Sequence, residues 1–451
     1  MRTRRRRSWV WDFAVIAALV GGAVLVSREV KAYRAARDVE GGKAELARQK
    51  KLAHDEGIPL TPAEFVAQDD LPAGLDAAPA YHAATTLYLK LAHGDPNGHA
   101  FSPFQFDDPK IAKANREFLT REKPAIAAIE KAARMQRCNL HVDFSNMGFE
   151  FPRLSEFKLL AKLAAGEAEM EARDGHPEVG LRTLAAVAPM CGHLGQTHTM
   201  IAALVETAVE GILTREVNSI LSQFGPQPGV AKAAAEALRG LDYRPDLIRM
   251  AEAENLLQMN AFSDDITKGP EPKDEGDEEE RAMAAVLRIG RKPGVLDRWR
   301  AVQIESERRY VELFRQPATT WLDLENRTVA LDRELLKPAD DAHAWRIYVG
   351  GDTWPAALDT MGLVVSTHRV LAQAAAEFEH ARSGSYTPGL PLTGEAARDP
   401  MGKGDYHYAV TSKGFKIYGC GPYGVDHGGK ARGNQAGTVE YDIVFEFPKK
   451  P

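Results

Sequence analysis

The segment with the densest chemical signals lies near the C-terminus and reads "YGCGPYGVDHGGKAR" over residues 418–432. Its glycines and its lysine satisfy two nucleotide-binding patterns at once, G-x-G-x-x-G and G-x-x-x-x-G-K. The residues concerned are Gly419, Gly421, Gly424, Gly429 and Lys430. The chemistry would be phosphate binding, in which backbone N–H groups of the glycine loop and of a following helix surround the anion.

Three features of the segment argue against a nucleotide site. The chain continues as "KARGNQAGTVEYDIV" and ends in a strand pattern, whereas both motifs require a helix after the glycines. Pro422 lacks an N–H donor, and Ala431 stands where a Walker loop needs Ser or Thr to bind magnesium. We therefore expect residues 419–437 to form a wide loop between two strands, with glycines supplying positive φ angles and no nucleotide partner.

Three pieces around this loop resemble the C-terminal segment of the major pseudopilin of type II secretion systems. They read "DPMGKGDYHY", "FKIYGCGPYGVDHGG" and "YDIVF", and together they cover about 50 residues, 399–447. The resemblance implies a D-P-x-G start, a β-hairpin, a glycine-rich loop and a closing Asp-Ile. The N-terminus lacks the prepilin-peptidase site, so the chain resembles bacterial envelope proteins that join a helical domain to such a sheet.

The resemblance also implies a candidate calcium site, because the family's loop binds calcium through aspartates and backbone carbonyls. Asp442 matches the closing acidic ligand, and Glu440 is nearest to the acid expected before it. The family's other aspartate falls on Tyr423, which cannot chelate, so Asp426 is the candidate substitute. These oxygens would suit a hard cation. The alternative is a loop closed by Asx-type hydrogen bonds without metal, and we expect no other cofactor.

Further chemistry-bearing residues occur in three small groups. The first group has side chains that can bind zinc, and the second and third could each pair a carboxylate with an imidazole. All three are also compatible with ordinary turns or core positions. The groups are Cys191, His193 and His198; Asp340, Asp341 and His343; and His141 with Asp143. The sequence contains no G-x-S-x-G, H-E-x-x-H or C-x-x-C motif, so no enzyme class is indicated.

The first 27 residues predict a membrane anchor. A cluster of arginines within residues 2–7 precedes an apolar run that, extended from Trp9 to Ser27, reaches the length of about 20 residues needed for a bilayer span. The positive-inside rule makes residues 1–8 a cytoplasmic basic tail and residues 9–27 a transmembrane signal anchor. The bulk of the chain would then lie outside the bacterial cytoplasmic membrane. A cleaved signal peptide and a soluble N-terminus are the alternatives.

The rest of the 451 residues divides into three parts. Residues 28–76 predict an exposed helical stalk and a linker. Residues 77–382 are helical nearly throughout, except that residues 264–280 are acidic, almost devoid of apolar side chains and expected to form a mobile loop. Residues 383–451 change to turn and strand composition and predict a small β domain.

Local patterns refine this division. The segment Leu159 to Leu194 predicts a helical hairpin that resembles a tetratricopeptide-type repeat, and Met200 to Phe224 predicts one long helix. Three strands are expected at residues 406–412, 415–420 and 441–447. The predicted fold is mainly α, with an N-terminal transmembrane helix, an array of helical hairpins and a small C-terminal antiparallel sheet.

Composition limits the function. The net charge of -6 argues against a nucleic-acid partner, and three widely spaced cysteines exclude a disulfide-built scaffold. We expect a membrane-anchored extracytoplasmic binding or scaffold protein with a protein partner, and we favour a non-enzymatic role. The alternatives are an accessory component of a secretion or pilus-like machine and an enzyme with a scattered site.

Overall fold

The computed structural model of the chain describes residues 39–66, 76–93, 106–140, 142–144, 154–239, 241, 243–268, 278–335, 353–382, 385–411, 414–432 and 441–448. The predicted transmembrane segment, residues 9–27, lies outside these ranges, as do Glu440, His141 and residues 340–343. Among the described helices, none combines the length and the apolar character needed to cross a membrane.

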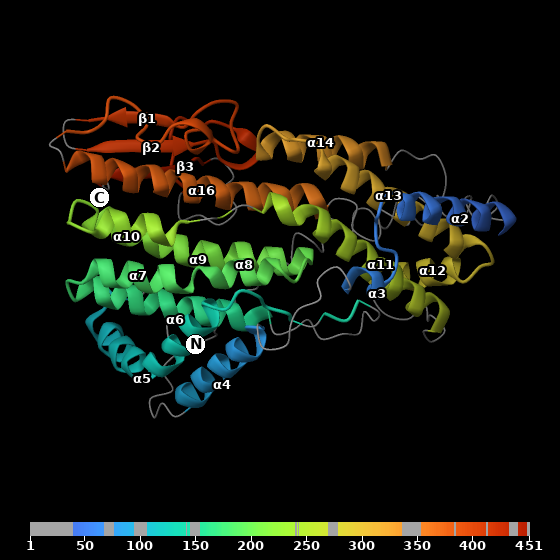
Figure 1. Cartoon of the computed structure of the whole chain (residues 1–451), viewed down its shortest axis with the longest axis horizontal. Coiled ribbons are helices and arrows are strands. Elements are labelled where there is room, and N and C mark those ends of the chain that lie inside the picture. The colour runs from blue at the N-terminus through green and yellow to red at the C-terminus, as the bar shows by residue number, and fades with distance from the viewer. Residues whose placement is uncertain are drawn as a thin grey trace.

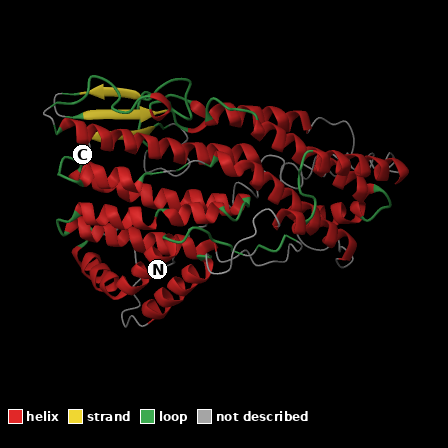
Figure 2. Cartoon of the chain, viewed as in Figure 1, coloured by secondary structure: helices red, strands yellow, loops and turns green. Residues whose placement is uncertain are grey.

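Helices make up most of the described chain, and most of them run along the long axis of the body (Figure 1; Figure 2). The α-helices are α2 (Val39–Asp55), α3 (Pro62–Val66), α4 (Ala78–His93), α5 (Pro109–Ala133), α6 (Leu154–Arg173), α7 (Pro177–Val187), α8 (Pro189–Gly195), α9 (Met200–Phe224), α10 (Val230–Ala237), α11 (Leu247–Lys268), α12 (Glu278–Gly290), α13 (Val295–Arg315), α14 (Trp321–Leu335) and α16 (Thr353–Ala381). Three short 3-10 turns are η1 (Arg244–Asp246), η2 (Gly394–Ala396) and η3 (Pro422–Gly424). The predicted mainly helical class is confirmed.

The helices stack in successive layers. Helices α6 and α7 pack on α9 and α10, these pack on α16, and α16 carries the sheet on its other side (Figure 1). At the opposite end of the body, α2, α11, α12 and α13 form a second group. Large buried side chains fill the layers, including Phe118, Leu160 and Leu184, so a continuous apolar core holds the array together.

The predicted hairpin is present as α6 and α7. The two helices join at residues 174–176, where Gly175 has a φ of 92°, a conformation that glycine adopts without steric cost. At Gly180 an added Cβ would lie 2.4 Å from the Ala168 carbonyl oxygen. Only glycine therefore allows the helices to approach so closely.

The prediction of an exposed stalk is wrong for residues 39–55, because α2 packs against α13. Its buried positions are Gly42, Leu46, Gln49 and Ala53, spaced four, three and four residues apart. Two of these four residues are small and one is polar, so the stripe does not look apolar, yet it forms one continuous face of a helix. Arg308 of α13 donates to Gln49 and also pairs with Glu56.

The predicted acidic loop is shorter than expected. Helix α11 continues to Lys268 and α12 already begins at Glu278, so both ends of the 264–280 segment are helical. In α11, Ser263 and Ile266 are buried and extend the packed face into the segment. Residues 269–277 lie outside the described residues.

The predicted C-terminal sheet is confirmed. Strands β1 (His407–Val410), β2 (Phe415–Gly419) and β3 (Ile443–Phe447) form an antiparallel sheet in the order β1-β2-β3. The register pairs Tyr408 with Ile417 and Ile417 with Phe445. One sheet face lies on α16, where the Phe378 ring centroid is 5.1 Å from that of Phe415. The sheet and the helices thus share one core.

Candidate anion-binding pocket

The loop between β2 and β3 places the predicted metal ligands in different settings. Asp442 is 2% exposed, and its carboxylate accepts backbone N–H groups from His427 at 2.9 Å, Gly429 at 2.6 Å and Lys430 at 3.2 Å. Asp426 accepts the N–H of Gly428 at 2.7 Å, and its other oxygen lies 3.4 Å from Nε2 of His407.

Both aspartates therefore hold the backbone of the loop. The Asp442 carboxylate accepts the N–H of His427, the residue after Asp426, whereas the Asp426 carboxylate accepts the N–H of Gly428. In the described part of the chain, no group of three or more His, Cys, Asp or Glu side chains is arranged to hold a metal ion. Glu440 lies outside the described residues, so the calcium site stays a prediction.

The glycines of the two nucleotide-like patterns have steric roles. At Gly421 an added Cβ would lie 1.6 Å from the Tyr441 carbonyl oxygen, and at Gly419 it would lie 2.6 Å from Cε1 of Tyr406. Gly424 has a φ of 69°. No helix follows these glycines within residues 425–432, where Ala431 instead forms a β-bridge with Asp442. Over the described residues 420–432, the predicted non-helical loop after strand β2 is therefore present.

The possible zinc ligands lie in the helical core. His193 Nδ1 is 2.8 Å from the Tyr81 hydroxyl, and its Nε2 is 2.8 Å from the Met135 carbonyl oxygen. Burial lowers the pKa of His193. Cys191 is buried, and the ring of His198 packs edge-on against Phe65. His193 thus has both ring nitrogens engaged in holding α8 against its neighbours.

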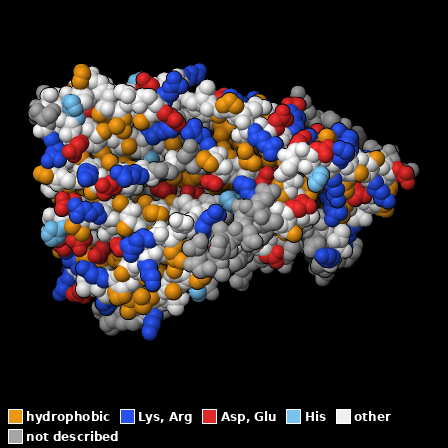
Figure 3. Space-filling view, viewed as in Figure 1, with side chains coloured by type: hydrophobic (Ala, Val, Ile, Leu, Met, Phe, Trp, Pro, Cys, Tyr) orange, Lys and Arg blue, Asp and Glu red, His pale blue; other side chains and the backbone are white. Residues whose placement is uncertain are grey.

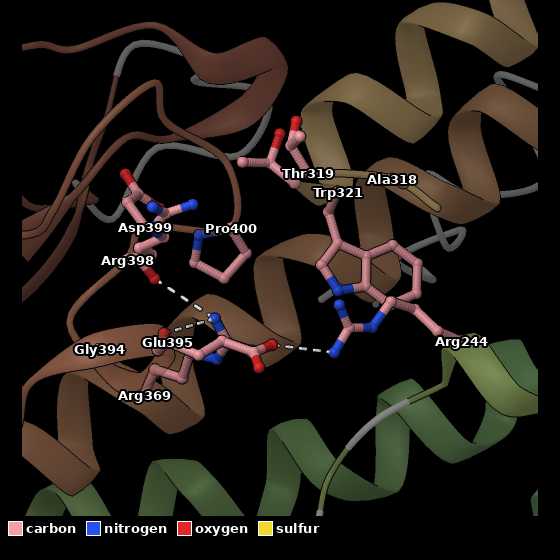
Figure 4. Close-up of a pocket in the computed structure, with 11 residues that line it drawn as sticks. Arg244, Ala318, Thr319, Trp321, Arg369, Gly394, Glu395, Arg398, Asp399 and Pro400 are labelled. Carbon is pink, nitrogen blue, oxygen red and sulfur yellow. Dashed lines mark hydrogen bonds and ion pairs between the residues drawn. The ribbon is translucent and has the colours of Figure 1, made fainter. Parts of the chain in front are cut away.

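A cavity of about 410 Å³ lies where the helical body meets the C-terminal segment (Figure 4). It is bordered by η1, the start of α14, α16, η2 and the turn that begins at the D-P-x-G motif. Its lining residues are Arg244, Ala318, Thr319, Thr320, Trp321, Arg369, Gly394, Glu395, Arg398, Asp399 and Pro400. Three arginines on separate elements give this cavity its chemical character.

Two of the arginines share one carboxylate oxygen. Oε1 of Glu395 lies 3.0 Å from Nη2 of Arg244 and 3.0 Å from Nη2 of Arg369 (Figure 4). Hydrogen bonds from Arg244 and then Arg369 lower the pKa of the Glu395 carboxyl. The third arginine, Arg398, is exposed, and its carbonyl oxygen accepts a hydrogen bond from Nη1 of Arg369 at 3.3 Å (Figure 4). The arrangement shows that the cavity accommodates an oxyanion between two guanidinium groups.

Buried hydrogen bonds fix the wall formed by residues 398–400. Asp399 is 2% exposed and accepts the backbone N–H groups of Met401 at 3.0 Å and Cys420 at 2.6 Å. Burial raises the pKa of the Asp399 carboxyl, and these two N–H groups oppose that effect. An added Cβ at Gly402 would lie 2.6 Å from Oδ2 of Asp399, which explains the glycine of the motif.

The wall formed by α14 is fixed by its N-terminal turn. Thr320 Oγ1 accepts the Asp323 N–H at 3.0 Å and so caps the first turn, and the Asp323 carboxylate accepts the Thr319 N–H at 3.1 Å. The Leu322 N–H bonds to the Pro400 carbonyl oxygen at 3.2 Å. The two walls of the cavity are therefore tied directly to each other.

Charged side chains of both signs are mixed on the visible surface (Figure 3). On the face shown in Figure 3, cationic and anionic side chains are interspersed over the described residues, without a broad patch of one sign. The pocket, by contrast, brings three arginines together in its lining.

Buried acids also occur near the centre of the helical body. Glu210 Oε2 lies 2.8 Å from Nε2 of His368, and burial raises the pKa of the neighbouring Glu206. These three side chains are nearly inaccessible to solvent and are not among those that line the arginine pocket. The pocket therefore combines cationic and hydroxyl groups suited to binding, while the buried acids lie in the packed interior.

Comparison with protein-family models, with curated proteins and with solved structures found no match.

Proposed function

We propose that this chain is a membrane-anchored extracytoplasmic binding protein whose ligand is a small molecule carrying oxyanion groups. The observation that carries the proposal is the meeting of Arg244, Arg369 and Arg398 around a cavity of about 410 Å³. Ligand pockets commonly have volumes of about 300–1,000 Å³ with a few convergent polar groups. Guanidinium groups match the planar geometry of carboxylate and phosphate oxygens.

The charge balance supports an anionic ligand. The lining residues include three arginines and two carboxyl groups, those of Glu395 and Asp399, and burial raises the pKa of Asp399. The lining residues thus carry an excess positive charge. An anion entering the cavity would reduce that charge and would exchange hydration for hydrogen bonds to guanidinium groups.

Membrane anchoring forms the second part of the proposal and comes from the sequence. The arginine cluster and the apolar segment of residues 9–27 support an uncleaved anchor with the pocket on the outer side. An accessory role in a secretion machine is the second candidate. It is favoured by the order of a D-P-x-G turn, a hairpin, a glycine loop and a closing Asp442 directly before strand β3, which follows the pseudopilin-like pattern.

Titration calorimetry tests the binding function. Citrate, added to the purified full-length chain at constant pH and ionic strength, should give saturable binding with a stoichiometry near one. Citrate is a suitable probe because its several carboxylates can engage more than one arginine. Absence of saturable heat for citrate and for inorganic phosphate would refute the proposed oxyanion site.

A further inference from the structure

Glu395 occupies the position in the pocket that an incoming oxyanion would need. Its Oε1 is the shared acceptor for Arg244 and Arg369, each at 3.0 Å. The Glu395 side chain is 66% exposed, whereas that of Arg369 is 23% exposed. The carboxylate thus lies at the solvent side of a more enclosed guanidinium group.

The backbone of η2 is held independently of this carboxylate. The side chain of Gln373, buried in α16, donates to the carbonyl oxygens of Leu392 at 3.0 Å and Ala396 at 2.9 Å. Arg369 Nη1 donates to the Glu395 carbonyl oxygen at 3.1 Å. The Glu395 side chain can therefore rotate away while the turn itself stays in place.

Displacement of the carboxylate requires little free energy. Ion pairs with exposed partners contribute weakly to stability because water competes for both charges. A ligand with one carboxylate would only restore the contacts that it removes. A ligand with a second anionic group would gain an additional interaction where it reaches the exposed side chain of Arg398, another lining residue of the same cavity.

We propose that Glu395 is an internal competitor for the pocket, and that the ligand is a small di- or tricarboxylate whose first carboxylate replaces it between Arg244 and Arg369. This inference rests on the proposed binding function and identifies the ligand class. Glu395 then determines specificity, because it excludes monocarboxylates and admits ligands that also reach Arg398.

Calorimetric titration of Glu395→Gln tests the inference. The amide keeps the size of the side chain and removes the competing charge, so citrate should bind roughly three- to tenfold more tightly than to the native chain. Glu379→Gln is the matched control, because Glu379 is an exposed partner of Arg382 on α16 and its loss changes the net charge equally. Its citrate affinity should stay within about twofold of native.

Further arms separate the possible outcomes. Acetate should show no measurable binding to the native chain, and Glu395→Ala should shift citrate affinity in the same direction as Glu395→Gln. Equal or weaker citrate binding by both Glu395 variants would overturn the competitor role while leaving the binding function intact. Tighter binding of inorganic phosphate than of citrate would overturn the carboxylate class, and absence of all binding would refute the binding function itself.

Discussion

The side-chain amide of Gln373 and the backbone of Leu392 are joined by two reciprocal hydrogen bonds. Gln373 Nε2 donates to the Leu392 carbonyl oxygen at 3.0 Å, and the Leu392 N–H donates to Gln373 Oε1 at 2.9 Å. The side-chain amide thus satisfies both the N–H and the C=O group of Leu392, as a neighbouring β-strand would. It connects α16 to the segment that carries η2 and so positions one wall of the arginine pocket.

Replacement of this amide should disturb both stability and the pocket. Gln373→Leu removes three hydrogen bonds from a fully buried residue and leaves backbone groups without partners, so unfolding should become easier by about 2–4 kcal/mol. Urea unfolding measures the change. Gln227→Leu, at an exposed loop position, should alter stability by less than about 0.5 kcal/mol, and equal effects of the two variants would contradict this role.

The loop between β2 and β3 should depend on Asp442. Asp442→Ala removes the acceptor for the N–H groups of His427, Gly429 and Lys430. The free energy of unfolding should fall by about 2–4 kcal/mol. Asp426→Ala removes two exposed contacts, with the Gly428 N–H and with His407 Nε2, and should lower the free energy of unfolding by less than about 1 kcal/mol. A larger loss of melting temperature for Asp426→Ala than for Asp442→Ala would count against this account.

Calcium tests the remaining prediction for the same loop. If Asp426, Glu440 and Asp442 share an ion, millimolar calcium should raise the melting temperature of the native chain, since a ligand of the folded state stabilises it. The shift should disappear in Asp442→Ala and persist in Lys430→Ala. A native melting temperature that is insensitive to calcium would leave the loop as a hydrogen-bonded turn without metal.

Stability should fall as the pH rises from about 4.5 towards 10 because of Glu216. Burial, followed by a hydrogen bond with Glu169, raises the pKa of Glu216 from 4.5 to about 10. Between pH 4.5 and 10 the folded state therefore keeps the Glu216 proton, whereas the unfolded state loses it. The contribution of this protonated carboxyl to the free energy of unfolding is complete below about pH 4.5 and declines towards pH 10.

Glu216→Gln should remove most of this dependence. The amide cannot ionise, so the variant should become more stable relative to the native chain as pH rises from about 5 to about 9, by several kcal/mol. Urea unfolding at several pH values provides the measurement. Glu379→Gln, at an exposed site, should keep the native profile, and parallel profiles for native and Glu216→Gln would contradict the assignment.

Membrane anchoring can be checked by fractionation. The full-length chain should sediment with membranes, and removal of residues 1–27 should release a soluble form that still binds citrate. Recovery of the uncleaved full-length chain entirely in the soluble fraction would exclude the anchor.

The sequence predicted those elements whose signals are local. Helix α9 has the predicted bounds because Thr199 caps its first turn, where its hydroxyl oxygen accepts the Ala202 N–H, and Gly225 follows its last residue. The strands were predictable from alternation and aromatic content. The packing of α2 was not, because Gly42 and Gln49 do not mark a buried face by their chemistry.

The pocket could not be predicted, because its residues come together only in three dimensions. Arg244, Arg369 and Arg398 are far apart in the chain, and each resembles an ordinary surface charge. The only local signal was the D-P-x-G motif, whose Asp399 fixes one wall through Met401 and Cys420. Gly419 and Gly421, which belong to the nucleotide-like patterns, are required sterically where the loop after β2 begins.

The most direct measurement of the binding function is a citrate titration of Arg369→Met against Arg382→Met. Arg369 is the more enclosed partner of Glu395, whereas Arg382 is an exposed arginine at the end of α16 that pairs with Glu379 and does not line the pocket. Loss of the guanidinium at Arg369 should weaken citrate binding at least about tenfold, corresponding to about 1.4 kcal/mol, while Arg382→Met binds as the native chain does. Native citrate affinity in Arg369→Met would contradict the assignment of this pocket as the ligand site.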